Sequence, residues 1–500
     1  MTLHALRTVG VDKRFGQTHA NRAVSLAVVA GTVHGIVGEN GAGKSTIMNI
    51  VYGSLRADAG EVWVGGRRLT GGGPREAIAA GVGMVHQHFM LVESFTALEN
   101  LMLGAEGGGL LGLARARARA ELARLGADYG LEVPPDVPVA ELPLGMRQRV
   151  EILKALHRGA ELLILDEPTA VLTPGESGHL FRIVRALAGR GRTVILISHK
   201  LKEIMAVTDR VTVMRRGAVV GETATAETSP GRLAELMVGR PVDLAATREP
   251  VTPGPPLLEV EGLEVRDGRG VSRVRGVSFA VRAGEIVGIA GVSGNGQSEL
   301  LETLAGMRPP AAGRVSLRGR ALPADAAAAR RAGVGHVPED RLRLGLLGSF
   351  RAWENDLLGA AGPLVLDPKA AIAACRERMA AYDVRPPEPG LVAAGFSGGN
   401  QQKLVLAREI GRDPELLLVG QPTRGVDIGA VEFIHRQLLG LRARGKAIVL
   451  VSAELDEILA LSDRILVMFE GRIVGELPAG AADERRLGLM MTGAAVSPCS

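Results

Sequence analysis

Apolar residues in this chain gather in short runs that are separated by longer stretches with helical spacing. The runs at 33–38 (VHGIVG), 162–166 (LLILD) and 193–198 (TVILIS) are rich in Val, Ile and Leu. Such runs are typical of strands buried on both faces of a parallel sheet. The stretch 110–130 is rich in Ala, Leu and Arg and predicts a helix. The pattern therefore predicts an α/β fold built on parallel sheets.

The apolar runs recur, together with their neighbours, in the second half of the chain. Segment 31–46 (GTVHGIVGENGAGKST) matches 284–299 (GEIVGIAGVSGNGQSE), and 162–169 (LLILDEPT) matches 416–423 (LLLVGQPT). We infer that one unit of roughly 250 residues has been duplicated. The join contains REPVTPGPP, whose prolines favour an extended linker. The sequence predicts two domains joined by a proline-rich linker, with the bounds 1–240, 241–256 (linker) and 257–500.

Composition narrows the class of protein. The chain has 500 residues, 46% of them hydrophobic and 23% charged, which fits a globular protein too long for a single core. Cys375 and Cys499 do not form a disulfide framework, so we expect a reducing compartment. We expect neither a signal peptide nor a membrane span, since no long apolar run is present. The net charge of +5 permits nucleic acid or an anionic membrane surface as a partner, without requiring either.

The sequence GENGAGKST follows the apolar run at 33–38 and precedes a helical stretch. Its glycines allow a tight turn whose backbone N–H groups face a phosphate, at the positive end of the next helix. Lys44 is expected to reach the β- and γ-phosphates, and the Ser45 hydroxyl to bind magnesium. The predicted nucleotide-binding residues of this loop are Gly38, Glu39, Asn40, Gly41, Ala42, Gly43, Lys44, Ser45 and Thr46.

Two carboxylates end the apolar run at 162–166. We expect Asp166 to hold magnesium, directly or through water, and Glu167 to polarise the attacking water. Adjacent residues of a strand point in different directions, so the two carboxylates can take separate roles. Taken alone, two acids at a strand end would also fit a solvated loop.

Three further residues are candidates for the same site, each with a simpler alternative. Gln87 follows GMVH and can contact both magnesium and water, although it could equally be a surface glutamine. His199 follows ILIS and could contact the γ-phosphate, or could have a structural role. Phe15 could stack on adenine, or could be a core phenylalanine.

A second anion-binding motif lies in the second half of the chain. The segment FSGGNQQKLVLARE places Ser397, Gly398 and Gly399 at the start of a helix, where a hydroxyl and backbone N–H groups can bind an anion. The matching segment of the first half begins LPLG. There Pro143 removes both the hydroxyl and the N–H, and Leu144 replaces a glycine.

These motifs, in this order, resemble the ATP-binding cassette (ABC) ATPases, here as two tandem P-loop NTPase domains, each with a parallel-sheet core and a helical subdomain. The tandem form is similar to the ATPase subunit of bacterial importers for simple sugars and nucleosides. The segments DEPTAVLTP and GFSGGNQQK look most like the nucleoside subgroup. The resemblance implies ATP and Mg²⁺ as ligands, two transmembrane permease subunits and a solute-binding lipoprotein as partners, and a peripheral position on the cytoplasmic face of the inner membrane.

In this family two cassettes stack head to tail, so the resemblance implies two composite sites. The first combines Lys44, Ser45, Gln87, Asp166, Glu167 and His199 with the Ser397–Gly399 signature, and it is complete. The second has lost its lysine, its magnesium aspartate, its catalytic glutamate, its histidine and its signature serine. Its residues are Gln297, Ser298, Glu339, Gly420, Gln421 and Ala453 with Pro143, Leu144 and Gly145. We therefore expect one hydrolytic site, and one site that at most binds nucleotide.

Alternative functions differ in which features they would show. A double-cassette ATPase acting on ribosomes or DNA would keep both sites complete and carry a charged insert between the cassettes, and neither feature is present here. A scaffold without activity would not retain every part of one site. We therefore expect no nucleic-acid partner, and an importer of nucleosides with simple sugars as the alternative cargo.

Two surfaces suggest partners. The resemblance implies that the stretch 85–104 receives a short permease helix, and it carries Phe89, Met90, Leu91, Val92 and Phe95, which is a high apolar content for a loop. Arg115, Arg117 and Arg119 could in principle contact nucleic acid. A solvated helix face is the interpretation we favour for these arginines.

Overall fold

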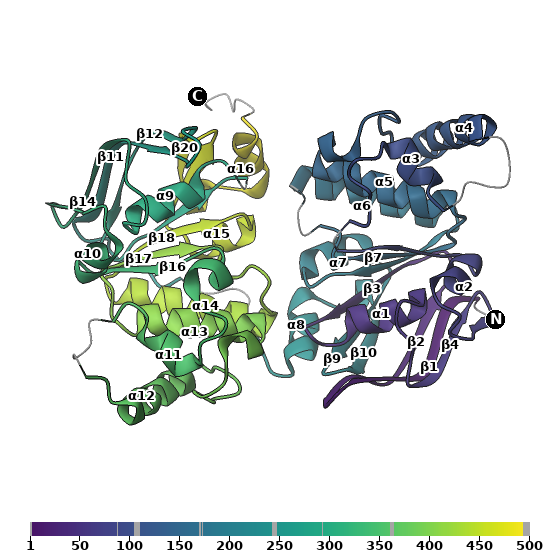
Figure 1. The fold of residues 1–500 in the computed structure, drawn as a ribbon, viewed down its shortest axis with the longest axis horizontal. Coiled ribbons are helices and arrows are strands. Elements are labelled where there is room, and N and C mark those ends of the chain that lie inside the picture. Colours follow the sequence, from purple (N-terminus) through teal and green to yellow (C-terminus); the bar gives the residue numbers. More distant parts are fainter. Residues whose placement is uncertain are drawn as a thin grey trace. The chain divides into compact units, whose positions relative to one another are not determined.

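A computed structural model describes residues 3–493, apart from 88, 105–110, 170–171, 173, 243–247, 293 and 361–364. The chain divides into two compact units, Met1–Val242 and Asp243–Ser500, and each is described here by itself (Figure 1).

A six-stranded sheet forms the centre of the first unit, with the strand order β10-β9-β3-β8-β7-β6. The strands from β9 to β6 run parallel and β10 pairs antiparallel to β9. Every residue of the runs at 33–38 and 162–166 is buried, which confirms the expected parallel core. The strands are β3 (Val33–Gly38), β6 (Val82–Val85), β7 (Leu162–Asp166), β8 (Thr193–Ile197), β9 (Arg210–Arg215) and β10 (Ala218–Ala224).

A second, antiparallel sheet in the first unit was not predicted. Its order is β2-β1-β4-β5, and it shares one hydrophobic core with the central sheet and helix α1. Half of its side chains face solvent, so its strands lack the continuous apolar runs that mark the parallel sheet. The strands are β1 (His4–Phe15), β2 (Thr18–Val29), β4 (Ala59–Val64) and β5 (Arg67–Leu69).

The helices of the first unit fall into two groups. Helices α3, α4 and α5 pack on one another as a helical subdomain, and the others lie beside the sheets (Figure 1). Helix α4 fits the predicted 110–130, and its Arg115 and Arg119 pair with Asp136 on a solvated face. The helices are α1 (Lys44–Tyr52), α2 (Pro74–Ala79), α3 (Ala97–Met102), α4 (Leu111–Tyr129), α5 (Leu144–His157), α6 (Pro174–Gly189), α7 (Leu201–Val207) and α8 (Pro230–Val238), with 3-10 turns η1 (Val139–Glu141) and η2 (Thr225–Glu227).

The second unit repeats this architecture. Its sheets have the orders β16-β17-β18-β13-β19-β20 and β12-β11-β14-β15. The strands are β11 (Pro256–Arg266), β12 (Ser272–Arg282), β13 (Ile286–Ala290), β14 (Ala312–Leu317), β15 (Arg320–Ala321), β16 (Val334–Val337), β17 (Leu416–Gly420), β18 (Ala447–Ser452), β19 (Arg464–Phe469) and β20 (Arg472–Pro478).

The helices of the second unit also correspond to those of the first. They are α9 (Gln297–Leu304), α10 (Ala326–Arg331), α11 (Ala352–Leu357), α12 (Pro368–Ala381), α13 (Gly398–Ile410), α14 (Ile428–Ala443), α15 (Leu455–Leu461) and α16 (Glu484–Met491). A π-helical turn, η3 (Arg341–Gly345), follows β16, and η4 (Ala393–Gly395) and η5 (Ala479–Ala481) are 3-10 turns.

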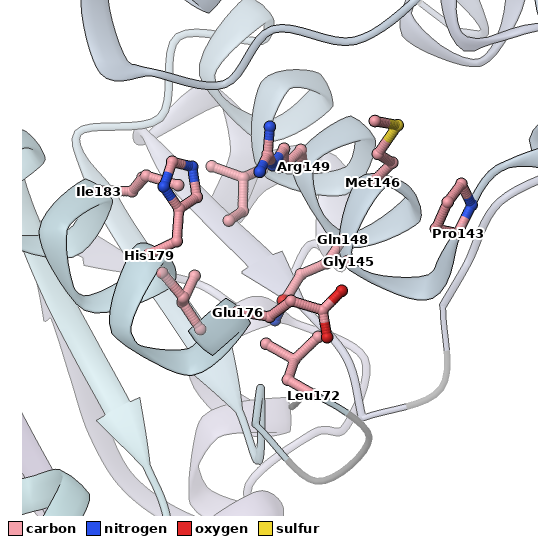
Figure 2. Close-up of a pocket in the computed structure, with 11 residues that line it drawn as sticks. Pro143, Gly145, Met146, Gln148, Arg149, Leu172, Glu176, His179 and Ile183 are labelled. Atoms are coloured by element: carbon pink, nitrogen blue, oxygen red, sulfur yellow. The ribbon is translucent and has the colours of Figure 1, made fainter. Parts of the chain in front are cut away.

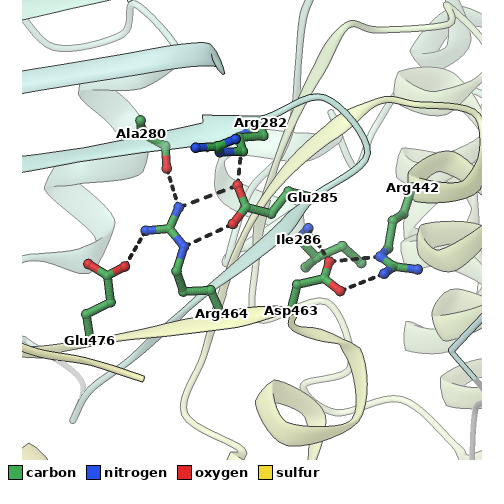
Figure 3. A network of polar contacts seen from close by, with 8 residues as sticks. All are labelled: Ala280, Arg282, Glu285, Ile286, Arg442, Asp463, Arg464 and Glu476. Carbon is green, nitrogen blue, oxygen red and sulfur yellow. Dashed lines mark hydrogen bonds and ion pairs between the residues drawn. The ribbon is translucent and has the colours of Figure 1, made fainter. Parts of the chain in front are cut away.

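Matching carboxylates fix the start of the central strand in both units. In the second unit Asp463 accepts a hydrogen bond from the Ile286 N–H at 2.9 Å and pairs with Arg442 (Figure 3). In the first unit Asp209 accepts from the Val33 N–H at 2.8 Å. The duplication therefore extends to single side-chain contacts.

The segment expected to be a linker ends earlier than the sequence indicated. Pro256 already lies in β11, where it pairs with Arg282. Before it, the Gly254 N–H donates to the Ala283 carbonyl oxygen and the Glu249 carbonyl oxygen accepts from Arg442. Prolines mark an extended backbone, but an extended backbone can still pack along a domain, and residues 248–255 do so.

Candidate functional site

The loop between β3 and α1 is a tight turn that only glycine allows at two positions. Gly43 caps α1 with a φ of 96°, a left-handed conformation, and a Cβ there would collide with the Ala20 carbonyl oxygen. A Cβ at Gly38 would collide with the Met214 carbonyl oxygen. The loop is held by the Asn21 amide, which donates to the Gly43 carbonyl oxygen at 3.0 Å. The result is a fixed row of backbone N–H groups at a helix N-terminus, a ready anion site.

Lys44 lies across this loop. Its side chain is buried, and its Nζ donates to the Gly38 carbonyl oxygen at 2.7 Å and to the Glu39 carbonyl oxygen at 3.0 Å. Burial lowers the pKa of Lys44, and the nearby Glu167 and Asp166 oppose that shift. The lysine charge is therefore held against two carbonyl oxygens of the loop, within electrostatic reach of Glu167 and Asp166.

Ser45 and Asp166 come together from opposite sides of this mouth. The Ser45 hydroxyl donates to Asp166 Oδ1 at 3.3 Å, although 121 residues separate them in the sequence. Burial raises the pKa of Asp166, and the Ser45 hydrogen bond opposes that shift. A hydroxyl and a carboxylate are hard oxygen donors of the kind that Mg²⁺ prefers. The pair therefore fits the magnesium role expected from the sequence.

Glu167 sits in a strained turn directly after β7. Its φ is 50°, and its N–H donates to the Ile197 carbonyl oxygen at 2.9 Å. His199, which follows β8, places its Nδ1 2.7 Å from Glu167 Oε2. The turn brings the Glu167 carboxylate to the histidine. The two neighbouring carboxylates therefore have different partners, Ser45 for Asp166 and His199 for Glu167.

Phe15 and Gln87 lie at the surface around this loop. Phe15 ends β1 and is 47% exposed, with Lys13 Nζ 5.6 Å from its ring centroid, so the alternative of a core phenylalanine is wrong. Gln87 lies two residues after the end of β6 and is exposed. An aromatic ring and an amide are therefore both accessible to a ligand.

His86 is a site residue that the sequence analysis missed. Its ring packs edge-on against Tyr52, with centroids 5.7 Å apart, and burial lowers its pKa while Asp166 opposes the shift. The signal was its position at the end of β6 beside Gln87, which is the same edge of the sheet as Asp166.

The second unit keeps the loop and loses its chemistry. Gln297 replaces the lysine and is buried, and its Nε2 donates to the Val292 carbonyl oxygen at 3.3 Å. The Ser298 hydroxyl donates to Glu339 Oε2 at 2.8 Å. A Cβ at Gly420 would lie 2.6 Å from the Glu339 Cγ, so Glu339 fills the space where Asp166 stands in the first unit.

The turn after β17 has the same backbone conformation as the turn after β7, but it carries Gln421 in place of Glu167. Gln421 has a φ of 46°, and its N–H donates to the Val451 carbonyl oxygen at 2.8 Å, as Glu167 does to Ile197. The Gln421 amide oxygen accepts from the Ala453 N–H at 3.2 Å. The backbone of this turn is thus retained, while glutamine stands in place of Glu167 and alanine in place of His199.

The two signature turns also differ. Ser397 caps α13, and its hydroxyl accepts from Asn400 Nδ2 at 2.8 Å. Pro143 caps α5, and Glu176 comes from α6 to lie beside Gly145, where a Cβ would be 2.7 Å from Oε1 (Figure 2). The first turn can present a hydroxyl and backbone N–H groups to an anion. The second presents a proline ring and a carboxylate, and it borders a pocket of about 220 Å³ between α5 and α6.

Comparison with known proteins identifies the family. The family model described as ABC transporter matches residues 21–170 and 274–424. The chain belongs to the ABC transporter ATP-binding proteins. This confirms the resemblance drawn from the motifs, and the chain is therefore an ATP-binding protein that hydrolyses ATP.

Relatives with similarity over their whole length are import ATP-binding proteins. The nucleoside import ATP-binding protein of Lactococcus lactis subsp. cremoris and the guanosine import ATP-binding protein of Bacillus subtilis are each 44% identical, over 98% of both chains. A glucose import ATP-binding protein of Haloferax volcanii is 45% identical over 98% of this chain and 96% of its own. Within the described residues, no helix is both long and apolar enough to cross a membrane.

Proposed function

We propose that this chain powers the import of nucleosides by hydrolysing ATP at one composite site. The observation that carries the proposal is the distribution of losses. Lys44, Asp166 and Glu167 are kept in the first unit while their counterparts are lost in the second. The signature is kept in the second unit and lost in the first. If the Lys44 loop of the first unit pairs with the Ser397 signature of the second, that site keeps every residue. All of the lost residues then belong to the other site, which pairs the Gln297 loop with the Pro143 turn.

The roles of the residues follow from their positions. Loop N–H groups and Lys44 bind the phosphates, Ser45 and Asp166 hold magnesium, and Phe15 stacks on the adenine. Magnesium, when bound, neutralises charge on the β- and γ-phosphates. Glu167 accepts the proton of the attacking water, and His199, 2.7 Å away, orients that carboxylate. Gln87 contacts the metal and the water from the end of β6.

Two apolar surfaces support membrane permeases as partners. In the first unit Met90, Val92 and Phe95 are exposed after β6, whereas Phe89 and Leu91 are half-buried. The second unit exposes Leu342, Leu344, Leu347 and Phe350 at the same place in its fold. Asn100 and Asn355 fix both segments in the same way, since each accepts from a backbone N–H (Val92, Leu347) at 2.8 Å. One such surface on each unit suits two permease subunits.

With such partners, we infer a peripheral subunit at the cytoplasmic face of the inner membrane, with a solute-binding lipoprotein as the further component. The guanosine and nucleoside relatives favour a nucleoside as the cargo. A simple sugar remains the second candidate, because the glucose import relative has about the same sequence identity to this chain as the two nucleoside relatives.

Uptake of radiolabelled nucleosides and sugars, by cells with and without this chain, tests the cargo. We expect nucleoside uptake to fall on deletion and to return with the wild-type gene but not with Lys44→Ala. Loss of sugar uptake alone would replace nucleosides with sugars as the cargo. Unchanged uptake of both would reject the importer function.

A further inference from the structure

An arginine fills the space in front of the signature helix in the second unit. Arg341 begins the turn after β16, and its Nε donates to Gln401 Oε1 at 3.3 Å on helix α13. Its Nη1 donates to the Arg424 carbonyl oxygen at 3.1 Å, in the loop after β17. A single guanidinium thus joins the signature helix to the neighbouring loop.

Gly398 makes room for this guanidinium. A Cβ at Gly398 would lie 2.5 Å from Arg341 Nη2, and Gly398 is not among the glycines with a positive φ. The backbone conformation therefore does not demand glycine at this position. Glycine at this position instead leaves room for the Arg341 guanidinium against the first turn of α13.

The partners that hold Arg341 are neutral. They are an amide oxygen and a backbone carbonyl oxygen, and no ion pair joins Arg341 to a carboxylate in the described part of the chain. The adjacent Asp340 uses its carboxylate to cap the turn, accepting from the Leu342 and Arg343 N–H groups. A half-buried guanidinium with neutral partners keeps its positive charge available to an anion.

The first unit has no arginine at the corresponding place. Alignment of the two repeats puts Phe89 at the position of Arg341, and Leu144 at that of Gly398. A carboxylate lies beside the signature turn in both units: Glu176 Oε1 is 2.7 Å from a Cβ placed on Gly145, and Asp427 Oδ2 is 3.1 Å from one placed on Gly399. The positive charge therefore accompanies the signature that retains its serine and glycines.

We propose that Arg341 is part of the signature site and recognises the terminal phosphate of a nucleoside triphosphate. This inference rests on the proposed pairing of the Ser397 turn with the Lys44 loop. The guanidinium adds a full charge to the Ser397 hydroxyl and the N–H groups of α13, and Gln401 and Arg424 fix its orientation. A charge at this position favours ATP over ADP, because only ATP carries the γ-phosphate.

Steady-state ATPase of the full-length protein, with ADP as a competing inhibitor, tests the proposal. Arg341→Gln should lower kcat/KM for ATP by about tenfold or more, the scale of one charge-assisted hydrogen bond. The inhibition constant of ADP should stay within about twofold in the same variant. Arg341→Lys should retain part of the activity, since it keeps the charge but not the fork of donors. Gly398→Ala should resemble Arg341→Gln, because the new Cβ displaces the guanidinium.

Arg343→Gln is the matched control, since Arg343 is exposed on the same turn and should behave as wild type. Unchanged kcat/KM in Arg341→Gln would overturn the proposal. So would equal weakening of ATP and ADP, which would indicate a merely structural role. The underlying pairing is tested separately: if Ser397→Arg abolishes turnover and Arg341→Gln does not, only the role of Arg341 fails.

Discussion

Glu167 and Gln421 occupy the same strained turn in two copies of one fold, so the difference between them is almost purely chemical. Both have a left-handed φ, and both donate their N–H to the neighbouring strand. We expect Glu167→Gln to retain ATP binding and to lower turnover by about 10²–10⁴-fold, because an amide cannot accept the proton of the attacking water. Steady-state ATPase, together with equilibrium binding of ATP, measures both effects.

The reverse substitution is the control for this prediction. Gln421→Glu should change turnover little, since Gln297 and Gly420 still lack the charge and the metal ligand of a competent site. Substantial ATPase activity in Glu167→Gln would show that hydrolysis does not depend on the first unit alone.

The pairing of loop and signature predicts an asymmetry between two arginine substitutions. Ser397→Arg should reduce ATPase activity about as severely as Lys44→Ala, because it places bulk where the γ-phosphate binds. Pro143→Arg should be mild, since that turn already lacks the signature serine. ATPase assays of the three variants test the pairing, once circular dichroism has shown that each variant is folded. The opposite ranking of the arginine variants would exclude the proposed pairing.

Single residues show what could be predicted from the sequence and what could not. Ser45 and Asp166 were predicted to share a magnesium role, and the structure brings them to hydrogen-bonding distance. The reason is that β3, which leads to Ser45, and β7, which ends at Asp166, have their carboxyl ends at the same edge of one sheet. The movement of Glu339 into the space of the missing aspartate was not predictable. It depends on the absence of a side chain at Gly420, which lies far away in the sequence.

At the scale of elements, helix α5 is joined to the segment after β6 by two side chains one helical turn apart. Glu151 accepts from the Met90 N–H, and Lys154 Nζ donates to the Met90 carbonyl oxygen at 3.0 Å. Burial raises the pKa of Glu151 to about 7, against the opposing effects of the Met90 bond and Lys154. The matching position in the second unit is Val405, so this contact belongs to the first unit alone.

The raised pKa of Glu151 predicts a pH dependence of stability. The folded chain binds this proton more tightly than the unfolded chain, so the stabilisation is present at low pH and is lost as the pH rises through about 7. Glu151→Gln mimics the neutral form. Its stability relative to wild type should therefore increase between pH 5 and pH 8, by at most about 3 kcal/mol. Thermal unfolding midpoints at a series of pH values measure the difference.

Glu93→Gln serves as the control, since Glu93 lies exposed in the same segment. It should follow the wild-type pH profile. A constant difference between Glu151→Gln and wild type from pH 5 to pH 8 would show that Glu151 does not titrate in this range.

Elements with continuous apolar runs were predictable, and those with one solvated face were not. The strands β3, β7 and β8 are buried on both faces, and their sequences contain little else than Val, Ile, Leu and Gly. The sheet of β1, β2, β4 and β5 was missed, because its strands have irregular register and alternate buried with exposed residues. Likewise, the prolines of the linker indicated an extended backbone but not the strand that begins at Pro256.

At the scale of the whole molecule, the duplication produces two units that have diverged in chemistry while keeping the same apolar surface. Both units expose large apolar side chains in the segment that follows one strand of the central sheet. That strand is β6 in the first unit and β16 in the second. Sequence analysis identified this surface only in the first unit. In the second unit Leu342, Leu344, Leu347 and Phe350 are scattered among polar residues, so their grouping becomes evident only once η3 has folded.

Met90 gives the sharpest test of this surface, because its backbone is fixed while its side chain is free. The Met90 backbone is bonded to Glu151 and Lys154, yet the residue is 65% exposed. We expect Met90→Glu to abolish most nucleoside uptake, since a charge cannot be buried against an apolar permease helix. ATPase of the isolated chain should be unchanged, because in the described residues the Met90 hydrogen bonds go to Glu151 and Lys154, which are not nucleotide-binding residues. Leu3→Glu, at a residue that is 74% exposed in the same unit, should leave both transport and ATPase intact.

Uptake in cells, paired with ATPase of the purified variants, separates coupling from catalysis. Normal uptake with Met90→Glu would show that this surface does not receive the permease.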